Sequence, residues 1–298
     1  VQLQNLPQNH MEDLEEAREL VKSGDYETFK MLYPAVTPTL SELIRTSLIE
    51  EEGHRFVVSD FSAIEARVSA WFANVEWRLD VFRNGGDIYC TSASQMFKVP
   101  VVKGGVNGHL RQKGKIAELA LGYGGGVNAL KAFGADKMGL TESEMQDIVT
   151  QWRLASPTIP RFWRDTEDAA KRALENPGRT FTLPCGVKYR RDADALRCRL
   201  PSGRILSYWD ARLEDGSIVF MGQNQTTRKW EKTETWGGKL VENIVQAFAR
   251  DCLAVALLRL DEEGYRVTFH VHDEVVIEEP ADGRTWQDAA EVMGRPID

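Results

Sequence analysis

Two aspartates in matching local settings are the residues of this 298-residue chain best placed to do chemistry. Asp60 follows the run 55–59 and Asp273 follows the run 265–271, and both runs have the β-branched and aromatic residues typical of strands. Between the two aspartates lies a cationic helical segment, residues 110–124. Two carboxylates can hold divalent metal ions, and a helical row of Arg and Lys can hold a triphosphate. The combination predicts a nucleotidyl-transfer enzyme.

The cationic segment carries Arg111, Lys115, Leu119 and Tyr123 at four-residue spacing, which places them on one face of a helix. A guanidinium and an ammonium one turn apart suit adjacent phosphates, and the phenol suits a base or sugar. Taken alone, this pattern is more typical of an exposed amphipathic helix with Leu119 packed inward. Its combination with the two aspartates is what favours nucleotide binding.

Helical periodicity and turn residues predict the elements that must position these groups. Pro34 and Pro38 are expected to interrupt the N-terminal helices, Asn74 is a candidate interruption, and Asp87 suits an N-cap. The helices are expected at 12–20, 26–32, 40–49, 63–82, 88–97, 110–123, 141–154, 158–175 and 239–260.

The strands are expected in two places. A β-rich insertion covers residues 180–222, with short runs separated by Gly, Pro and Asp. The strand 55–59 and the hairpin 265–279, which carries His272, Asp273 and Glu274 at its turn, form the other group.

Composition excludes several other classes of protein. A 42% hydrophobic content allows a sizeable core, whereas no run of about 18 apolar residues or signal-like leader is present, so neither a membrane partner nor export is expected. The four cysteines lack CxxC spacing, so neither a zinc ribbon nor a disulfide framework is indicated. The net charge of −8 is segregated: residues 1–55 carry eleven acids and five bases, and residues 179–212 carry eight bases and three acids. A local groove can therefore be positive on an acidic protein, and the alternative is a solvated basic face.

Five segments together resemble the DNA polymerase I-like, family A DNA polymerases of the phage and prophage type. They occur in the family's order: Leu3-Gln4-Asn5-Leu6-Pro7 is similar to LQNxP, Asp60-Phe-Ser-Ala-Ile-Glu65-Ala-Arg67 to motif A, Gly86-Asp87-Ile88-Tyr89 to GDIH, Arg111-x3-Lys115-x7-Tyr123-Gly124 to motif B, and Val271-His272-Asp273-Glu274 to motif C. The resemblance implies an α+β fold, with a palm on an antiparallel sheet and mostly helical fingers. It also implies template-directed DNA synthesis.

The same resemblance implies roles for individual residues. Asp60, Asp273 and the carbonyl of Phe61 would bind two Mg²⁺ ions, with Mn²⁺ as an alternative. Arg111 and Lys115 would clamp the dNTP phosphates, and Lys115 would also donate a proton to pyrophosphate. The remaining dNTP contacts would be Leu119, Tyr123, Tyr89 and Glu65, of which Glu65 excludes a 2′-hydroxyl. Primer–template contacts would come from Gln4, Asn5, Arg67, Asn243, Gln246, His272 and Glu274.

Four positions depart from the family pattern. Leu119 replaces the usual aromatic ring of motif B, Tyr89 replaces a histidine, and Ala63 removes a polar side chain from motif A. Asn243 and Gln246 are three residues apart where the family has four, so Gln246 carries the role better. The ring stacking that selects the incoming sugar is therefore expected to be weakened at Leu119.

We expect residues 1–83 to be the first part of the palm, 84–236 the fingers and 237–298 the second part of the palm. The family's thumb and exonuclease would precede residue 1, so the chain is interpreted as a piece of a longer, monomeric polymerase of the bacterial or phage-infected cytoplasm. Two alternatives stay open: a DNA-binding fragment that is inactive without its thumb, and a two-metal nuclease.

Overall fold

The chain divides into two compact units, each described here by itself. In a computed structural model, residues 6–224 and 227–297 are described. The first unit combines Val1–Ser62 with Cys252–Asp298, and the second is Ala63–Asp251. The helices that follow Asp60 pack into the core of the second unit, and the expected boundaries of palm and fingers stay a prediction.

The first unit is built on a three-stranded antiparallel sheet. Its strands are β1 (His54–Asp60), β8 (Arg266–Val271) and β9 (Glu274–Pro280), in the order β1-β9-β8. The central strand β9 buries five successive residues from Val275 to Glu279. The C-terminal end of α11 (Gly237–Glu262) and α12 (Trp286–Met293) share a core with this sheet, formed by residues such as Leu253, Leu260, Ile277 and Val292. The sheet is therefore held in place by its packing against α11 and α12.

Three short helices precede β1: α1 (Leu14–Ser23), α2 (Tyr26–Leu32) and α3 (Val36–Arg45). The expectation that Pro38 interrupts a helix is wrong, because Pro38 lies in the first turn of α3. There its missing N–H has no intrahelical acceptor to lose. Residues 46–49 lie beyond the helix rather than within it.

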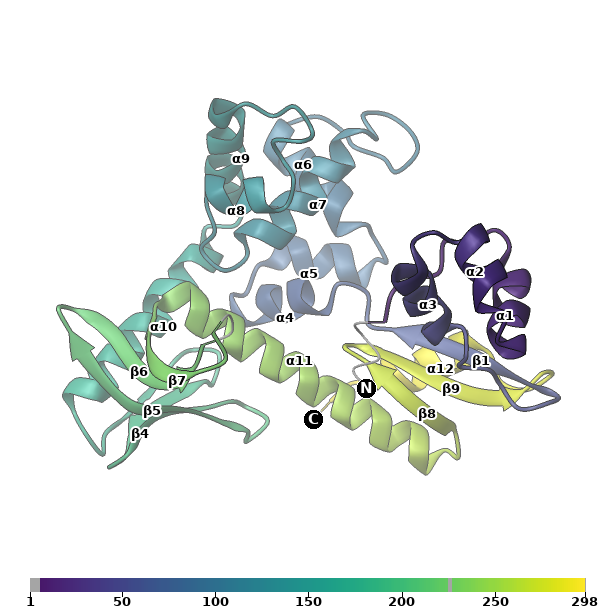
Figure 1. Cartoon of the computed structure of the whole chain (residues 1–298). Helices are drawn as coiled ribbons and strands as arrows, with labels where there is room; N and C mark the ends of the chain where they lie inside the picture. The colour runs from purple at the N-terminus through teal and green to yellow at the C-terminus, as the bar shows by residue number, and fades with distance from the viewer. Residues whose placement is uncertain (1–5, 225–226, 298) are drawn as a thin grey trace. The chain divides into compact units, whose positions relative to one another are not determined.

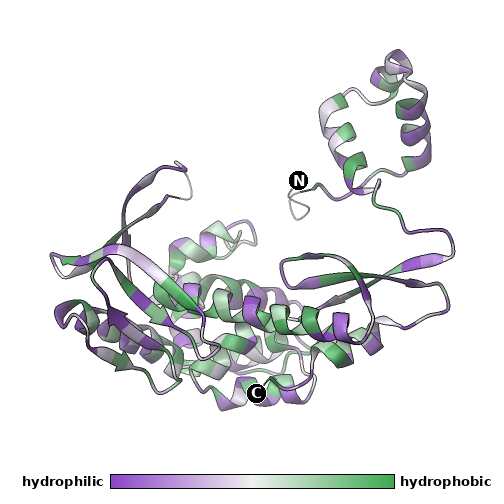
Figure 2. Cartoon of the chain, turned by 90° about the horizontal axis from the view of Figure 1, so that it is seen from below, coloured by the Kyte–Doolittle hydropathy of each residue, from purple (hydrophilic) through white to green (hydrophobic). Residues whose placement is uncertain are grey.

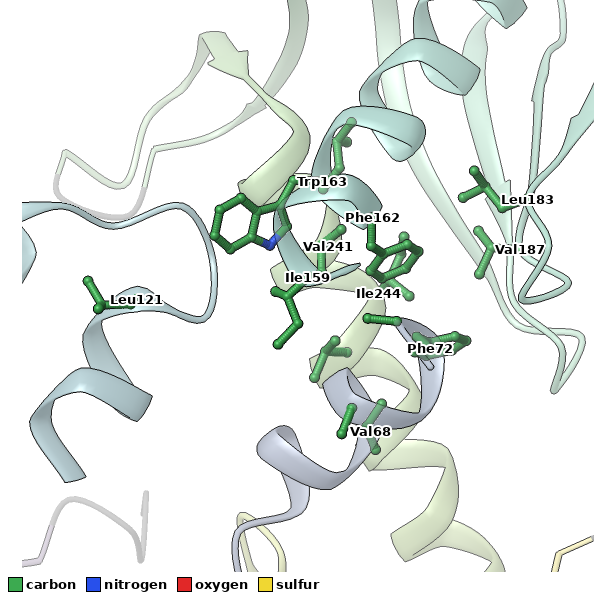
Figure 3. Packing of buried hydrophobic residues seen from close by; sticks show 14 of the residues in the cluster. Val68, Phe72, Leu121, Ile159, Phe162, Trp163, Leu183, Val187, Val241 and Ile244 are labelled. Carbon is green, nitrogen blue, oxygen red and sulfur yellow. The ribbon is translucent and has the colours of Figure 1, made fainter. Parts of the chain in front are cut away.

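The helices of the second unit surround one large core. They are α4 (Ile64–Phe72), α5 (Glu76–Arg83), α6 (Ile88–Phe97), α7 (Leu110–Leu121), α8 (Val127–Ala132), α9 (Glu142–Ala155) and α10 (Thr158–Glu175). The expected helix 63–82 is divided as anticipated, with Asn74 in the left-handed region (φ 51°) between α4 and α5. Figure 3 shows Val68 and Phe72 of α4 packed close to Phe162 of α10 and Ile244 of α11.

A six-stranded antiparallel sheet completes the second unit. Its strands follow one another in chain order: β2 (Thr180–Thr182), β3 (Lys188–Arg191), β4 (Ala195–Arg199), β5 (Ile205–Glu214), β6 (Ser217–Gln223) and β7 (Trp230–Thr235). One face is buried, through residues such as Phe181, Tyr189 and Leu196, and α10 packs against β2 and β3 (Figure 1). The β-rich insertion is therefore longer than the predicted 180–222, and its last strand was not anticipated.

The α+β fold class predicted from the sequence is confirmed, since both sheets are antiparallel and the helices form separate blocks. Figure 2 shows hydrophobic residues interleaved with hydrophilic ones along the elements. Within the described part of the chain, none of the helices combines the length and the apolar character that a membrane span needs, even though α11 has 26 residues.

Candidate active site

The strand pairing of the first unit brings the two predicted aspartates together. Asp60 ends β1 directly opposite Glu274, the first residue of β9. Beyond that pair, the N–H of Phe61 donates to the carbonyl of Asp273 at 3.3 Å. His272 and Asp273 form the two-residue turn between β8 and β9, and His272 takes the left-handed conformation (φ 52°) with its side chain exposed. Five residues predicted from the sequence therefore gather at one end of the sheet.

Negative charge accumulates at this end of the sheet. Partial burial raises the pKa of the Asp60 carboxyl, and the charges of Asp273 and Glu274 together with a side-chain hydrogen bond to Asp273 raise it further. A carboxyl whose pKa is raised by neighbouring carboxylates lies close enough to them to share a cation. The cluster is electrostatically suited to a bound divalent metal ion.

The chemistry of the donors fits Mg²⁺ or Mn²⁺, which prefer hard oxygen ligands. Within residues 6–224 and 227–297, no set of three or more His, Cys, Asp and Glu side chains is arranged as a complete metal cage. An incomplete protein ligand set is the usual arrangement for Mg²⁺, which keeps several waters and shares substrate phosphates. The aspartates thus suit a cation brought with, or completed by, a nucleotide.

In the second unit, Arg111 is held against the start of α6. Its Nε donates to Asp87 Oδ2 at 2.7 Å, and its guanidinium lies 5.2 Å from the ring centroid of Tyr89. Asp87 also caps α6 by accepting from the N–H groups of Tyr89 and Cys90 at 2.9 and 3.1 Å. Arg111 and Tyr89, both predicted to contact the nucleotide, are therefore neighbours, and Asp87 orients the guanidinium.

Substitutions of Asp87 can test which of its interactions stabilises the start of α6. Partial burial opposes ionisation, but hydrogen bonds from Arg111 and the α6 backbone hold the pKa of the Asp87 carboxyl below its usual value. Its stabilisation is therefore full at neutral pH and is lost as the pH falls through that lowered pKa. We expect Asp87→Ala to lower the free energy of unfolding by about 1 kcal/mol in urea titrations, because the cap is lost, whereas Asp87→Asn keeps most of the stability. Equal losses in both variants would mean that the ion pair with Arg111 outweighs the cap.

Lys115 and Leu119 continue the same face of α7. Lys115 is partly buried and, within the described residues, forms no ion pair, so its ammonium is available to an anionic ligand. Leu119 is 46% exposed, which leaves an apolar side chain on the same face. Gly114, which directly precedes Lys115, lets α6 and α7 pack closely, because a Cβ there would lie 2.2 Å from the carbonyl oxygen of Tyr89.

Tyr123 lies beyond the helix, which ends at Leu121 rather than near residue 123. Its hydroxyl donates to Glu65 Oε2 at 2.6 Å, and Gln246 Nε2 makes a longer 3.5 Å contact with Glu65 Oε1. Burial and the charge of Glu65 raise the pKa of the Tyr123 phenol well above its usual value, so it remains a donor. Three residues predicted separately from the sequence thus form one hydrogen-bonded group.

The loop after α7 is held so that Tyr123 keeps its place. The carbonyl of Gly122 accepts from Trp163 Nε1 at 3.1 Å, and that of Gly125 accepts from Arg153 at 3.0 Å. Gly125 must lack a side chain, because a Cβ would lie 1.9 Å from the carbonyl oxygen of Ala120. The glycine run therefore turns the chain sharply back on the helix.

The remaining predicted DNA contacts are dispersed. The guanidinium of Arg67 lies 4.5 Å from the Phe82 ring centroid, and burial lowers its pKa. Asn243 donates to the Tyr208 hydroxyl at 3.1 Å, so its amide is engaged by the β-sheet of the second unit. Gln4 and Asn5 lie outside the described residues.

One group was missed by the sequence reasoning: a buried ion pair between Arg78 of α5 and Glu118 of α7. Both side chains are almost fully buried, at 2% and 4% exposure, and the contact is bidentate. Glu118 also accepts from Ser92 at 2.6 Å and from Trp152 Nε1 at 2.8 Å, while Arg78 donates to Ser156 at 3.0 Å. Helix α7 is therefore tied to α5, α6 and α9. The available signal was the charged residue at 118, four residues after Gly114 on the face of α7 that packs against α6.

Comparisons with known proteins identify the family of the chain. The sequence profile described as DNA polymerase family A matches residues 3–187, and the chain belongs to that family. The DNA polymerase of Bacillus phage SP02 is 49% identical over 303 residues, which cover all of this chain and 46% of the phage protein. The thermostable DNA polymerase I of Thermus aquaticus is 28% identical over 251 residues, which cover 83% of this chain and 25% of that protein.

A solved structure has a similar fold: the POL domain of Pol1 from M. smegmatis, in complex with DNA primer-template and dNTP. The TM-score is 0.55 at 20% sequence identity, over 85% of this chain and 38% of that chain. The chain thus spans less than half the length of the phage relative and smaller shares of the others.

Proposed function

We propose that this chain carries the catalytic part of a template-directed DNA polymerase, which adds dNTPs to a primer 3′-hydroxyl. The observation that carries the proposal is the pairing of Asp60 with the Asp273 hairpin, which places two hard-oxygen carboxylates side by side. The membership of this chain in DNA polymerase family A supports the same reaction. The similar structure from M. smegmatis is a complex with DNA primer-template and dNTP, which are the substrates that we assign to this chain.

The proposal assigns a separate role in the reaction to each group of site residues. Asp60, Asp273 and the Phe61 carbonyl would hold two Mg²⁺ ions, or Mn²⁺. Such ions, when bound, lower the pKa of the attacking hydroxyl and neutralise the triphosphate. Arg111 and Lys115 would bind the phosphates, with Lys115 carrying the proton for the leaving pyrophosphate. Palm, fingers and DNA contacts at Arg67, Gln246, His272 and Glu274 belong to the same proposal.

The direct test is single-turnover extension of a labelled primer on a template, with the protein expressed from its complete reading frame. Extension with dNTPs and Mg²⁺ supports the proposal. Degradation of the primer without any dNTP requirement would instead identify a two-metal nuclease, and tight DNA binding without extension would identify an inactive DNA-binding protein. Either of the last two results would refute template-directed synthesis by this chain.

Glu65 gives a prediction about sugar choice. The hydrogen bond from Tyr123 fixes its carboxylate, which we assign to the space of a ribonucleotide 2′-hydroxyl. We expect Glu65→Ala to raise incorporation of ribonucleotides relative to deoxynucleotides by about 10- to 100-fold, because excluding a small group is worth about 1–3 kcal/mol. Tyr123→Phe, which keeps Glu65 but releases it, should move the ratio less and in the same direction. An unchanged ratio of ribonucleotide to deoxynucleotide incorporation in both variants would show that Glu65 does not exclude the 2′-hydroxyl.

A further inference from the structure

Positive charge is concentrated in the segment from Ile88 to Ala117. These thirty residues carry five cations (Lys98, Lys103, Arg111, Lys113 and Lys115), together with His109 and not one Asp or Glu, in a chain whose net charge is −8. The segment consists of α6, the loop that follows it and α7 as far as Ala117, the residue before Glu118 (Figure 1). The proposed nucleotide site uses only Arg111 and Lys115, so three lysines have no assigned role.

The three lysines mark the α6–α7 connection. Lys98 ends α6 in the left-handed conformation (φ 57°), and Lys103 lies in the loop, beside a turn in which Val102 N–H donates to the carbonyl of Val106 at 2.9 Å. Lys113 Nζ lies 5.8 Å from the ring centroid of Phe97, the last residue of α6. Lys113 is therefore next to the end of α6 that Lys98 caps. We name Lys98, Lys103 and Lys113 the hairpin lysines, after the α6–loop–α7 segment that carries them; they are not part of the β-hairpin with Asp273.

Lys113 lies on a different side of α7 from Lys115 of the proposed phosphate clamp. Gly114 faces α6, with an ideal Cβ position 3.1 Å from the Cβ of Ala93. Successive helical residues are rotated by about 100°, so Lys113 and Lys115 flank that line of contact on opposite sides. A ligand on the hairpin lysines would thus not compete with a nucleotide on Lys115.

Nearby acids do not form ion pairs with these lysines. Within residues 6–224 and 227–297, none of the hairpin lysines forms an ion pair, whereas Arg111 is paired with Asp87. Glu144 is the acid that Lys113 influences, and its carboxylate is already engaged by the Thr141 N–H and hydroxyl, both at 2.8 Å. Lys98 and Lys103 are exposed, as are Val102 and Val106 of the loop, at 54% and 64%.

We propose that the hairpin lysines bind the phosphates of the single-stranded template overhang. The inference rests on the proposed function, since template-directed synthesis always presents such a strand. Flexible ammonium groups act as point charges for phosphates, and the loop offers no exposed aromatic ring on which bases could stack. Binding should therefore depend strongly on salt and little on base sequence.

The test compares Lys98→Ala/Lys103→Ala/Lys113→Ala with a control that loses the same charge elsewhere, Lys22→Ala/Lys30→Ala/Lys137→Ala, whose lysines are all exposed. Fluorescence anisotropy would follow binding of a primer–template with an overhang of about 12 nucleotides, or of about one nucleotide, over a range of salt. Each lost contact to single-stranded phosphate reduces the slope of log affinity against log salt by about 0.7. We expect the hairpin variant to lose about 2 from the slope on the long overhang only, and the control to lose none.

Three outcomes would overturn the proposal. Equal slopes of log affinity against log salt for the hairpin variant and the control on the long overhang would show that the hairpin lysines do not contact phosphates. Equal losses on long and short overhangs would place the contacts on the duplex instead. Weaker binding of polyglutamate without weaker binding of overhang DNA would point to an acidic protein partner. Because anisotropy needs no chemistry, failure of extension by the unaltered protein refutes the proposed function separately.

Discussion

Asp60→Asn is expected to lower the single-turnover rate of nucleotide incorporation by about 10³-fold or more, because the metal ions supply several kcal/mol of transition-state stabilisation. Asp60 and the Asp273 turn meet at the end of the sheet, so each substitution removes one of the two carboxylates that the proposal assigns to the metal ions. Asp273→Asn should have an effect of the same order. Rapid-quench measurements with saturating DNA and dNTP would separate the loss in rate from a loss in binding.

The same substitution has an expected effect of opposite sign on stability. The pKa of Asp60 is raised in the folded protein, so ionisation of this group disfavours folding, and its cost grows as the pH rises from the unfolded pKa through the folded one. Without divalent metal, Asp60→Asn should therefore melt at a higher temperature than the unaltered protein at neutral pH. The difference should disappear below about pH 4, where the carboxyl is protonated in both states.

Asp282→Asn is the matched control, since Asp282 is an exposed acid in the same unit, after the end of β9 that pairs with His54. It should change neither the incorporation rate nor the melting temperature. Added Mg²⁺ should raise the melting temperature of the unaltered protein and of this control, but less that of Asp60→Asn, because only a formed site stabilises the fold. An Asp60→Asn variant that extends primers at the normal rate would refute the metal assignment.

Much of the site could be predicted because it depends on local sequence. The strand before Asp60 and the hairpin around Asp273 follow from β-branched runs, and antiparallel pairing then brings their ends together. The α6 cap at Asp87 and the break at Asn74 follow from side-chain and backbone preferences of single residues. The helical stripe from Arg111 to Leu119 follows from spacing alone.

The rest depends on partners far apart in sequence. The hydrogen bond between Tyr123 and Glu65 joins residues 58 positions apart, and the contact of Asn243 with Tyr208 spans 35. Periodicity contains no information about such pairs. The strand β7 was missed because Trp230–Thr235 alternates polar and apolar residues only weakly, and its place is decided by pairing with β6.

The subdomain boundaries also remained a matter of tertiary packing. Phe72 lies in the segment that we expect to be the first part of the palm, and it packs with Phe162 at a centroid distance of 6.0 Å in the core of the second unit. The division of α11 between two cores, with Ile244 in one and Leu253 in the other, is equally invisible in its continuous helical pattern.

The buried pair of Arg78 and Glu118 should be the most sensitive point of the second unit. Either Glu118→Ala or Arg78→Ala would leave one buried charge without its partner, and we expect a loss of about 3–5 kcal/mol in the free energy of unfolding. Urea titration followed by tryptophan fluorescence would measure it, since Trp152 donates to Glu118 and reports on the same place. Arg83→Ala, which breaks an exposed ion pair on the same helix α5, should cause no measurable loss.

The double variant Arg78→Met/Glu118→Leu separates the cost of an unpaired charge from the value of the pair itself. With both charges gone, the remaining cost comes from Ser92, Trp152 and Ser156, whose polar groups lose their partners. We therefore expect the double variant to be more stable than either single alanine variant. Its dNTP binding should still be weaker than normal, because Glu118 ties α7, and with it Lys115, to α5, α6 and α9 through four donors. If the two single losses simply added in the double variant, Arg78 and Glu118 would be acting independently, and α7 would be held by its apolar packing alone.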